Sequence, residues 1–558
     1  MVDLKLNVAR VVCCVLFIWS IGVFGAVAQD TVLYVGLSGS DTVGDGSAER
    51  PFRTVEVAAD QAEPGTTIYL LEGTYEEQTV ITGQGTADLP ITIEPAPNAA
   101  VRFDGSQLTI PENQNLVLIR DSAHLIFQGF EISNSTGRGL GVFESEHITL
   151  RDNRVHDTIG RGIGGGGNHI TIENNEVWNA SLENENEAFG ATGGWKAGIS
   201  TYKRADDSAS TNFIIRNNHI HDVWGEGIIA LFVDGALIEG NEVHDTYSVN
   251  IYVDNGRNID IVGNYLHTTT TRYNRLDRPF PANGIQLANE SYSEAPPTQV
   301  ENILIGNNLI VGAGRAIRFW HDDRNLDPFN SYQNVQIVHN VVKNSHEIAI
   351  HFDGVGLTGV TPENVLVQNN IIFAGGQGQA LNIAHPDAWT FLHNNWPNGV
   401  PELAEGPNSF AAQPLFAGST GSLAPEDFVL QAESTSLGAG LPFSTLTTDY
   451  WGNVRHPERP SLGIYEPKEL AIEATAVPPT AEPDTTIAEE PTPTQTPASV
   501  SSTATLVVSQ PVSTATAVPP TAPPSTADNN AITVVVLFAL AGIFLIGILL
   551  WVIYRHSR

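Results

Sequence analysis

An arginine, a histidine and an aspartate at matching places in neighbouring repeats are the residues of this sequence best suited to proton transfer. Arg318 and His351 each follow the isoleucine of a similar apolar phrase, and Asp353 lies two residues after His351. An arginine neutralises carboxylates, a histidine titrates near neutral pH, and an aspartate accepts or donates a proton. Whether these groups can act together depends on the elements that carry them.

Those elements are repeats marked by an asparagine. The phrase apolar-x-apolar-x-x-Asn-x-apolar recurs, most copies lie 22 to 32 residues apart, and two gaps of 43 and 44 residues each hold an insertion. The asparagines are Asn153, Asn175, Asn218, Asn241, Asn264, Asn308, Asn340, Asn370 and Asn395. A repeat in this range is typical of a solenoid in which each repeat is one coil.

The apolar phrases predict strands rather than helices. Ile148-Thr149-Leu150 and Ile303-Leu304-Ile305 are short, alternating and rich in β-branched residues. Stacked coils bring equivalent side chains to about 4.8 Å, so that an asparagine can hydrogen-bond the asparagines above and below it. We therefore interpret the nine asparagines as a structural ladder. The strand pattern of the phrases excludes helical repeats.

Motifs at both ends of the repeats carry a family resemblance. Pro51-Phe52-Arg53-Thr54 and Gly73-Thr74-Tyr75 resemble an amino-terminal cap, and Gly463-Ile464-Tyr465-Glu466 resembles a closing segment. Over residues 31–466 the chain resembles the right-handed parallel β-helix proteins of the pectin-lyase-like fold, a family of secreted bacterial proteins. The resemblance implies an all-β, right-handed, single-stranded parallel β-helix with terminal caps, whose capping helix would span residues 55–62. Caps cover strand edges that would otherwise be unpaired.

Composition divides the whole chain into segments. We expect a signal peptide (1–28), an N-terminal cap with the first coils (29–123), β-helix repeats (124–400), a C-terminal cap segment (401–466), a Pro/Thr/Ser-rich stalk (467–530), a transmembrane helix (531–554) and a cytoplasmic tail (555–558).

The two ends predict the location of the protein. Lys5 and Arg10 precede an apolar run that ends at Ala26-Val27-Ala28, which is typical of a secretory signal. The only cysteines, Cys13 and Cys14, lie inside it, so the mature chain has no disulfide and no thiolate metal site. The apolar stretch 531–554 is long enough to cross a bilayer, and the stalk before it cannot bury a core. We expect an extracellular head tethered to the cell surface by a single C-terminal helix.

Charge restricts the partners. The formal net charge of -35 excludes a nucleic-acid partner, because phosphate binding needs a basic surface. An acidic polysaccharide would also be repelled at long range unless a local cluster of cations or a bound Ca²⁺ offset the charge. Ca²⁺ is the one cofactor that the sequence brings forward, and no metal ligands are assigned. A neutral glycan stays open as a partner.

Aligning the coils on one strand identifies a candidate face. The inward residues are Ile163, Ile199, Ile228, Ile251, Ile285, Ile317, Ile350 and Leu381, so the following residue of each coil points outward. Insertions on both sides of this strand predict a walled groove; they span residues 179–197, 268–282, 289–301, 321–333 and 354–363. The outward residues that we expect to bind substrate are Tyr202, Lys203, Tyr252, Asp254, Gln286 and Trp320. The aromatic residues among them would stack on sugar rings, or would pack the loops onto the helix.

Coil spacing decides which polar groups can cooperate. Lys203 and Arg318 are four coils apart, roughly 19 Å, which is too far to act on one sugar. Arg318 and His351 occupy consecutive coils and are about 5 Å apart. In a lyase, Arg318 would neutralise a uronate and His351 would take the C5 proton. In a hydrolase, Asp353 and Asp322 would be the acid and the base. Charged groups of this kind also form ion pairs that have no catalytic role.

Known catalytic signatures of related families are missing. The sequence has no Gly-His-Gly with paired aspartates, as in polygalacturonases, and no Asp-Pro-His-Asp, as in mannuronan epimerases. No specific activity can therefore be assigned from a motif. We expect a cell-surface polysaccharide lyase or glycoside hydrolase, with a non-catalytic adhesin or glycan-binding protein as the alternative.

A second column of residues follows the ladder asparagines by three positions: His156, Trp178, His221, His244 and His267. Rings stacked at about 4.8 Å are parallel and do not converge on one ion. We interpret this column as a stack that stabilises the fold rather than as a metal site.

Overall fold

The computed structural model describes residues 31–189, 195–276, 278–292, 296–321, 332–353, 362–418 and 424–468. All of them belong to one compact unit, Met1–Pro479. The predicted signal peptide, transmembrane helix and cytoplasmic tail, and residues 469–530 of the predicted stalk, lie outside the described residues. Within the described part of the chain, no helix is long and apolar enough to cross a membrane.

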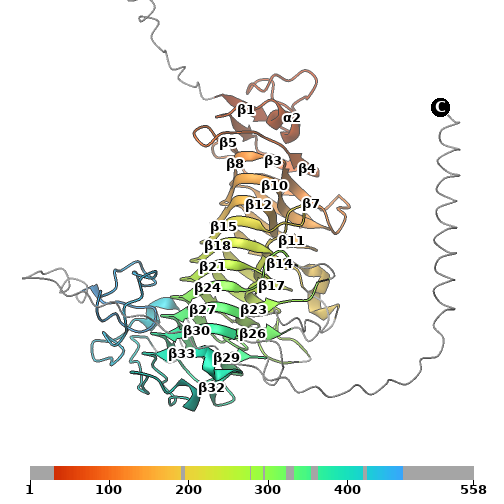
Figure 1. Cartoon of the computed structure of the whole chain (residues 1–558). Helices are drawn as coiled ribbons and strands as arrows, with labels where there is room; N and C mark the ends of the chain where they lie inside the picture. The colour runs from red at the N-terminus through yellow and green to blue at the C-terminus, as the bar shows by residue number, and fades with distance from the viewer. Residues whose placement is uncertain are drawn as a thin grey trace, which may run out of the picture. The chain divides into compact units, whose positions relative to one another are not determined.

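The strands form three rows of parallel strands, because each coil contributes one strand to each row (Figure 1). Row 1 consists of β4 (Thr79–Ile81), β7 (Asn115–Arg120), β14 (Ala197–Thr201), β17 (Glu226–Leu231), β20 (Val249–Asp254), β23 (Asn283–Asn289), β26 (Ile317–His321), β29 (Ile348–Phe352) and β32 (Gln379–Asn382). Row 2 consists of β1 (Val32–Val35), β2 (Thr67–Leu70), β5 (Ile91–Pro95), β8 (Ala123–Gln128), β15 (Ser210–Arg216), β18 (Val233–Glu239), β21 (Arg257–Val262), β24 (Glu301–Gly306), β27 (Tyr332–Val338), β30 (Pro362–Gln368) and β33 (Trp389–Leu392).

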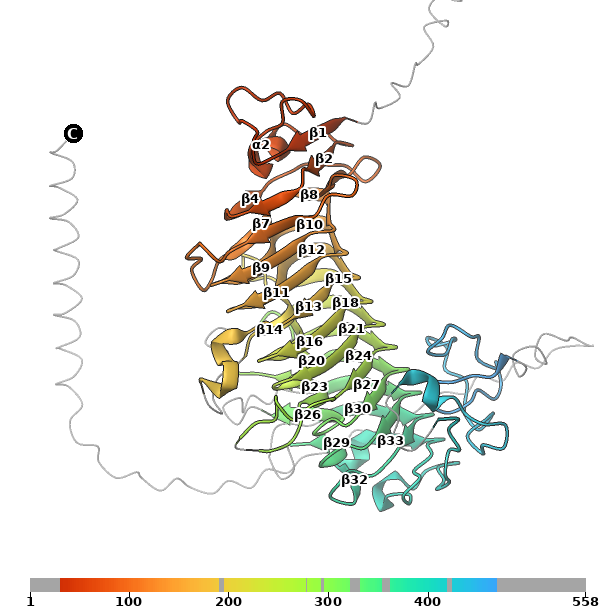
Figure 2. The same cartoon turned by 180° about the vertical axis from the view of Figure 1, so that it is seen from behind.

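Two long strands, β10 (Arg138–Arg151) and β12 (Ile163–Glu173), run through both rows and join them into one 22-stranded sheet. Row 3 is a separate 11-stranded sheet, seen from behind in Figure 2. It consists of β3 (Gly73–Tyr75), β6 (Val101–Asp104), β9 (Glu131–Ser135), β11 (Arg154–Thr158), β13 (Glu176–Trp178), β16 (His219–Val223), β19 (Glu242–Thr246), β22 (Tyr265–His267), β25 (Leu309–Val311), β28 (Val341–Lys343) and β31 (Ile371–Ile372).

The core is a continuous cluster of apolar side chains inside the coils. In row 1, Ile199 pairs with Ile228, Ile228 with Ile251, and Ile251 with Ile285, and all four are fully buried. Because side chains alternate along a strand, each inward isoleucine is followed by an outward residue. The register that we predicted for this strand is confirmed.

An asparagine ladder joins the coils at one turn. The side-chain amide of Asn241 donates to the side-chain oxygen of Asn264 at 3.0 Å, and Asn241 accepts from the amide of Asn218 at 3.0 Å. The ladder asparagines are fully or almost fully buried, so each bond satisfies groups that water cannot reach. The residue before each ladder asparagine has a positive φ, as at Asn217 (54°) and Gly263 (65°), a conformation that Asn and Gly tolerate.

The prediction for the last rung was wrong by one residue. Asn370 donates to the side chain of Asn394 at 2.9 Å, not to Asn395. Asn395 instead donates to Ser436 at 2.9 Å. Adjacent asparagines at the end of the repeats caused this slip, because both follow an apolar phrase.

A helix caps the amino-terminal end as predicted, but it ends at Asp60, two residues before the predicted end at residue 62. Helix α2 (Val55–Asp60) begins at the N-cap Thr54, whose hydroxyl accepts from the backbone N–H of Val57. Val55, Ala58 and Ala59 are buried in the main core, so the helix closes the apolar interior at this end.

The C-terminal segment covers a side of the β-helix as well as its end. Ala404 of this segment belongs to the main core, which also contains Trp389 of β33 and Trp396 shortly after it. Further along, residues 428–464 contribute apolar side chains that pack against the outer face of row 3 at Leu309 and Ile371. The described residues include the short 3-10 helices η1 (Leu182–Glu187), η3 (Pro386–Ala388), η4 (Glu402–Ala404) and η5 (Pro425–Phe428).

Candidate functional site

The outward face of row 1 brings the predicted residues into register. Gln286 pairs with Arg318 on the next strand, and Arg318 pairs with His351. Two residues further along, Asp254 pairs with Ala288, and Ala288 pairs with Trp320. The columns that we predicted from coil alignment are therefore confirmed on β20, β23, β26 and β29.

Asp353 is the centre of the polar cluster at the end of β29. Its Oδ2 accepts from Arg318 Nε at 3.0 Å and also contacts Arg318 Nη2, and its Oδ1 lies 2.9 Å from His351 Nδ1. Burial alone would raise the pKa of Asp353, but the hydrogen bond from His351 and the charge of Arg318 outweigh it and lower the pKa to about 2. The carboxylate is therefore charged at neutral pH.

Because Asp353 is charged, Asp353 and His351 would have different roles. A carboxylate with so low a pKa is a poor general acid, which weakens the predicted hydrolase role of Asp353. It instead holds Nδ1 of His351, so the opposite ring nitrogen is left to accept a proton. Asp322, the other carboxylate of that prediction, lies outside the described residues.

Two further arginines surround this cluster. Arg315 Nη1 lies 3.6 Å from Asp353 Oδ1, and Arg315 Nε lies 3.1 Å from Glu347 Oε2. Burial, followed by the charges of Arg318 and Arg315, lowers the pKa of Arg278 to about 10, so Arg278 still carries its charge at neutral pH. Among the residues that the structure describes here, three guanidinium groups lie around two carboxylates, so the described part of this cluster holds more cationic than anionic groups.

Sequence reasoning missed Arg278, Arg315 and Glu347. Arg315 and Glu347 lie at the turns just before β26 and β29, so the alternation that identified the outward columns does not reach them. Their only signal in the sequence is that Arg315 lies three residues before Arg318 and Glu347 lies four residues before His351.

A second cluster, made of carboxyl groups, lies on the coils before it. Tyr252 donates to Glu290, and Tyr292 donates to Asp254. Burial, followed by the charges of Glu290 and Asp254, raises the pKa of Glu226 well above its usual value. Glu226 is 3 % exposed, so its surroundings disfavour the charged form. Glu226 and Glu290 could not be identified from the sequence, because burial of an acid depends on loops that fold over the strand.

Tyr252 does not offer a free ring to a sugar. Its side chain is 4 % exposed and packs in a small apolar cluster with Ile229 and Ala288, against which Leu231 and Trp320 also pack. Of the two interpretations that we gave for the aromatic residues, packing of the outer face describes Tyr252. Trp320 is less buried than Tyr252 and retains part of its surface.

Tyr202 and Lys203 lie away from both clusters, at the end of β14. The guanidinium of Arg161 lies 4.8 Å from the centre of the Tyr202 ring, and Arg138 lies 5.5 Å from it. Lys203 Nζ lies 2.6 Å from Asp207 Oδ1. Four coils separate these residues from Arg318, as predicted, because β17, β20 and β23 lie between their strands.

The histidine column on row 3 is a ring stack. The ring centres of His156 and Trp178 lie 4.1 Å apart, those of His221 and His244 lie 5.2 Å apart, and those of His244 and His267 lie 4.6 Å apart, with the planes close to parallel. The predicted stacking is confirmed.

The strand register and the matching families agree on the fold. Residues 33–213 match the family described as Pel9A-like, right handed beta helix region, and residues 185–330 match the family described as right handed beta helix region. The chain is a right-handed parallel β-helix of the pectin-lyase-like fold. The first of these matches ends before β17, so the polar cluster around Asp353 lies outside it.

Two curated proteins are similar to part of this β-helix. The uncharacterized protein YwoF of Bacillus subtilis (strain 168) is 33% identical over 132 residues, which cover 22% of this chain and 28% of that protein. The pectate lyase PEL9 of Emericella nidulans is 30% identical over 137 residues, which cover 22% of this chain and 33% of that protein. The β-helix thus matches about a third of the length of these relatives, or less. The crystal structure of pectate lyase Pel9A superposes with a TM-score of 0.45 at 15% identity, over 79% of this chain and 97% of that chain.

Proposed function

We propose that the outer face of row 1 binds an acidic polysaccharide and cleaves it by β-elimination at His351. The observation that carries this proposal is the pairing of His351 with Asp353, whose pKa is lowered to about 2, beside the guanidinium groups of Arg318, Arg315 and Arg278. The similarity of one part of the chain to a pectate lyase supports the same substrate class.

Each group has one role in the reaction. The guanidinium groups neutralise a uronate carboxylate, which acidifies the proton on the neighbouring C5. The free nitrogen of His351 takes that proton, the C4–oxygen bond breaks, a C4–C5 double bond forms, and a proton from solvent completes the leaving hydroxyl. Asp353, whose Oδ1 lies 2.9 Å from Nδ1 of His351, orients the ring of His351.

The local positive charge also offsets the repulsion that the composition predicts for an acidic polysaccharide. The net charge of -35 would repel a polyuronate at long range. Three arginines around two carboxylates create a cationic patch. A bound polysaccharide would lie within about a Debye length of this patch, where nearby charges outweigh the net charge of the protein. A hydrolase at the same cluster is less well supported, because Asp353 cannot supply the proton at neutral pH.

A panel of polyuronates and neutral glycans tests the proposal. Elimination products absorb in the ultraviolet, whereas hydrolysis produces only new reducing ends. His351→Ala should lower the rate of elimination by about 10² or more. Arg318→Ala should do most damage with highly charged substrates, and Trp320→Ala should raise KM more than it lowers kcat. His346→Ala is the matched control, because this exposed histidine lies on the same coil outside the cluster.

The outcomes separate the candidate functions. Reducing ends without ultraviolet absorbance would replace the lyase with a hydrolase. Binding of several glycans without any cleavage would favour the adhesin. Full activity in both His351→Ala and Arg318→Ala would show that the chemistry is on another face.

We also propose that the β-helix is displayed at the cell surface. The supporting features are the signal-like residues 1–28, the Pro/Thr/Ser-rich residues 467–530 and the apolar residues 531–554. Display on a tether suits a protein that acts on polymers too large to enter the cell.

A further inference from the structure

Two parallel columns of side chains share the outer face of row 3. One column is the ring stack that contains His221 and His244. The other, two residues earlier on each strand, is formed by Arg154, Glu176, His219 and Glu242, because Arg154 pairs with Glu176, Glu176 with His219, and His219 with Glu242. Imidazole rings of one column therefore lie beside carboxylates of the other. Their ligand atoms can approach a common point, whereas the parallel rings of a single stack cannot.

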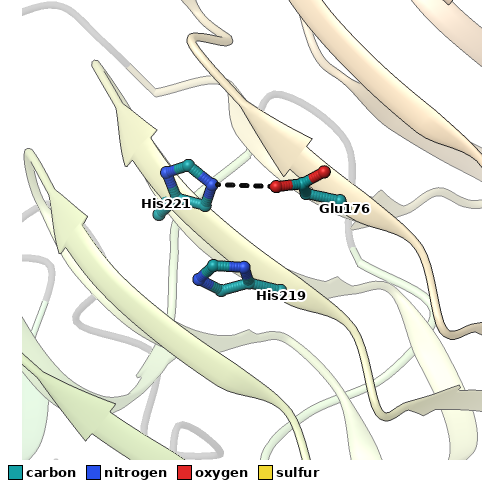
Figure 3. A group of neighbouring side chains, drawn as sticks. All are labelled: Glu176, His219 and His221. Atoms are coloured by element: carbon teal, nitrogen blue, oxygen red, sulfur yellow. Dashed lines mark ion pairs between the residues drawn. The ribbon is translucent and has the colours of Figure 1, made fainter. Parts of the chain in front are cut away.

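One group across the two columns comes close enough to share an ion. One ligand atom from each of Glu176, His219 and His221 lies within 4.8 Å of the other two. Figure 3 shows the carboxylate of Glu176 turned toward the ring of His221, with His219 beside both. The distance from His221 Nε2 to Glu176 Oε1 is 3.7 Å, close to the roughly 3.4 Å between two ligands of a tetrahedral zinc ion.

The hydrogen bonds around His221 leave one buried nitrogen without a partner. His221 Nδ1 lies 2.8 Å from Asp222 Oδ2, so Nδ1 carries the proton and Nε2 presents its lone pair. Nε2 is buried and has no hydrogen-bond partner. The other oxygen of Asp222 accepts from the hydroxyl of Tyr273 at 2.8 Å. A carboxylate that orients a histidine in this way is typical of the outer shell of metal sites.

The same reasoning assigns the proton on His219. His244 Nδ1 lies 2.8 Å from Asp245 Oδ2 and donates to it, so Nε2 of His244 is an acceptor. His219 Nε2 lies 3.1 Å from that nitrogen and must donate, which leaves Nδ1 of His219 with a lone pair.

We propose that Glu176, His219 and His221 bind one divalent cation of the zinc class. Two imidazole nitrogens and one carboxylate oxygen are ligands preferred by Zn²⁺, Ni²⁺ and Cu²⁺ rather than by Ca²⁺ or Mg²⁺. Arg154 Nε donates to the other oxygen of Glu176 at 3.0 Å, so Oε1 remains available to the ion. Water from the open face of row 3 would complete a tetrahedral site.

The position of the site suggests what the ion does. Glu176 lies on β13 and both histidines lie on β16, so the ion would link two coils between which the chain makes a long insertion. Their ladder asparagines, Asn175 and Asn218, are 43 residues apart. A metal that binds only the folded chain stabilises it by mass action, so the ion would stabilise the stacking of these two coils.

Calorimetric titration of the purified full chain with ZnCl₂ tests this proposal. The protein carries no histidine tag and is first stripped with a chelator. We expect one saturable site per chain, a higher melting temperature with Zn²⁺, and no competition from a large excess of Ca²⁺. Glu176→Gln should weaken binding at least tenfold, and it keeps the shape of the side chain. His221→Ala should do the same.

Two control variants make the assignment specific. His147→Ala removes a ring from a different stack, whose neighbours lie 4.5 and 4.4 Å away, and should not change the affinity. Glu242→Gln should also leave it unchanged, although His219, Glu242 and His244 form a second close group. Loss of binding in Glu242→Gln but not in Glu176→Gln would overturn the assignment. Absence of a saturable site, equal binding by all variants, or displacement by Ca²⁺ would overturn it too.

Discussion

The side-chain amide of Asn175 donates to the side-chain oxygen of Asn218 at 3.0 Å, although 43 residues separate them. Asn218 and Asn241, only 23 residues apart, make the same bond at 3.0 Å. The insertion between the first pair therefore leaves the stacking of the coils unchanged. Loops can carry the site because the ladder keeps the strands beneath them in register.

Replacing Asn241 with leucine should destabilise the β-helix by about 3 kcal/mol. Asn241 bonds to Asn218, Asn264 and the carbonyl of Ile215, and leucine would leave these buried groups unpaired. Urea unfolding followed by circular dichroism measures the loss. Glu239→Leu, at an exposed position on the same coil, is the control and should change stability little. Equal midpoints for both variants would contradict the structural role of the ladder.

Asp353→Asn should cost about 2 kcal/mol at neutral pH and progressively less in acid. The pKa of Asp353 in the folded protein is about 2, below its unfolded value, so its charge contributes stability above the unfolded pKa of about 3.9. That contribution is lost as the pH falls through the folded pKa. Unfolding free energies of the native protein and the variant should therefore converge between about pH 4 and pH 2. A gap that stays constant over this range would rule out the ionised carboxylate as its cause.

Glu226→Gln should make the protein less sensitive to rising pH. Burial and nearby acids raise the folded pKa of Glu226, so the neutral acid stabilises the fold fully below the unfolded pKa of about 4.3. This contribution is lost as the pH rises through the folded pKa. Glutamine mimics the neutral acid, so its advantage over the native side chain should grow as the pH rises above the unfolded pKa. Parallel stability curves of the two proteins would contradict a raised pKa of Glu226.

Protease added to intact cells should release a soluble fragment that ends within residues 467–530. This stretch is rich in Pro, Thr, Ser and Ala and cannot bury a core, so it should be cut before the folded β-helix. Mass spectrometry of the supernatant identifies the end of the fragment. Deletion of residues 531–554 provides the control, because that variant should enter the medium without protease. Recovery of the native chain only from the cytoplasm would refute surface display.

The repeats could be predicted because the coil has a strict local pattern. Strands, inward columns and eight of the nine ladder asparagines follow from alternation and period alone, since each coil repeats the same contacts. Asn394 was missed in favour of Asn395 because the pattern tolerates either where the repeats end. The side-on packing of the C-terminal segment could not be predicted, because it depends on contacts far apart in the sequence.

The site could be predicted only where it lies on the strands. Gln286, Arg318 and His351 share an outward column, and a fixed rise per coil gives their spacing. Arg315 lies in the turn before β26 and Glu226 is the first residue of β17, where alternation gives way to turn geometry. The titration of Glu226 and Asp353 depends on burial and on neighbours that only the folded loops supply.

The C-terminal segment is tied to particular coils, and this bears on how the length of the β-helix can change in evolution. Arg455 donates to the side chain of Asn307 at 2.6 Å, and Asn369 donates to the carbonyl of Leu441 at 2.7 Å. Loss or gain of a coil between these two anchors would change their separation by about 4.8 Å and break one of them. Coils before β22 carry no such tie among the described residues. Natural variation in coil number should therefore concentrate in the amino-terminal half, while the half that holds His351 keeps a fixed count.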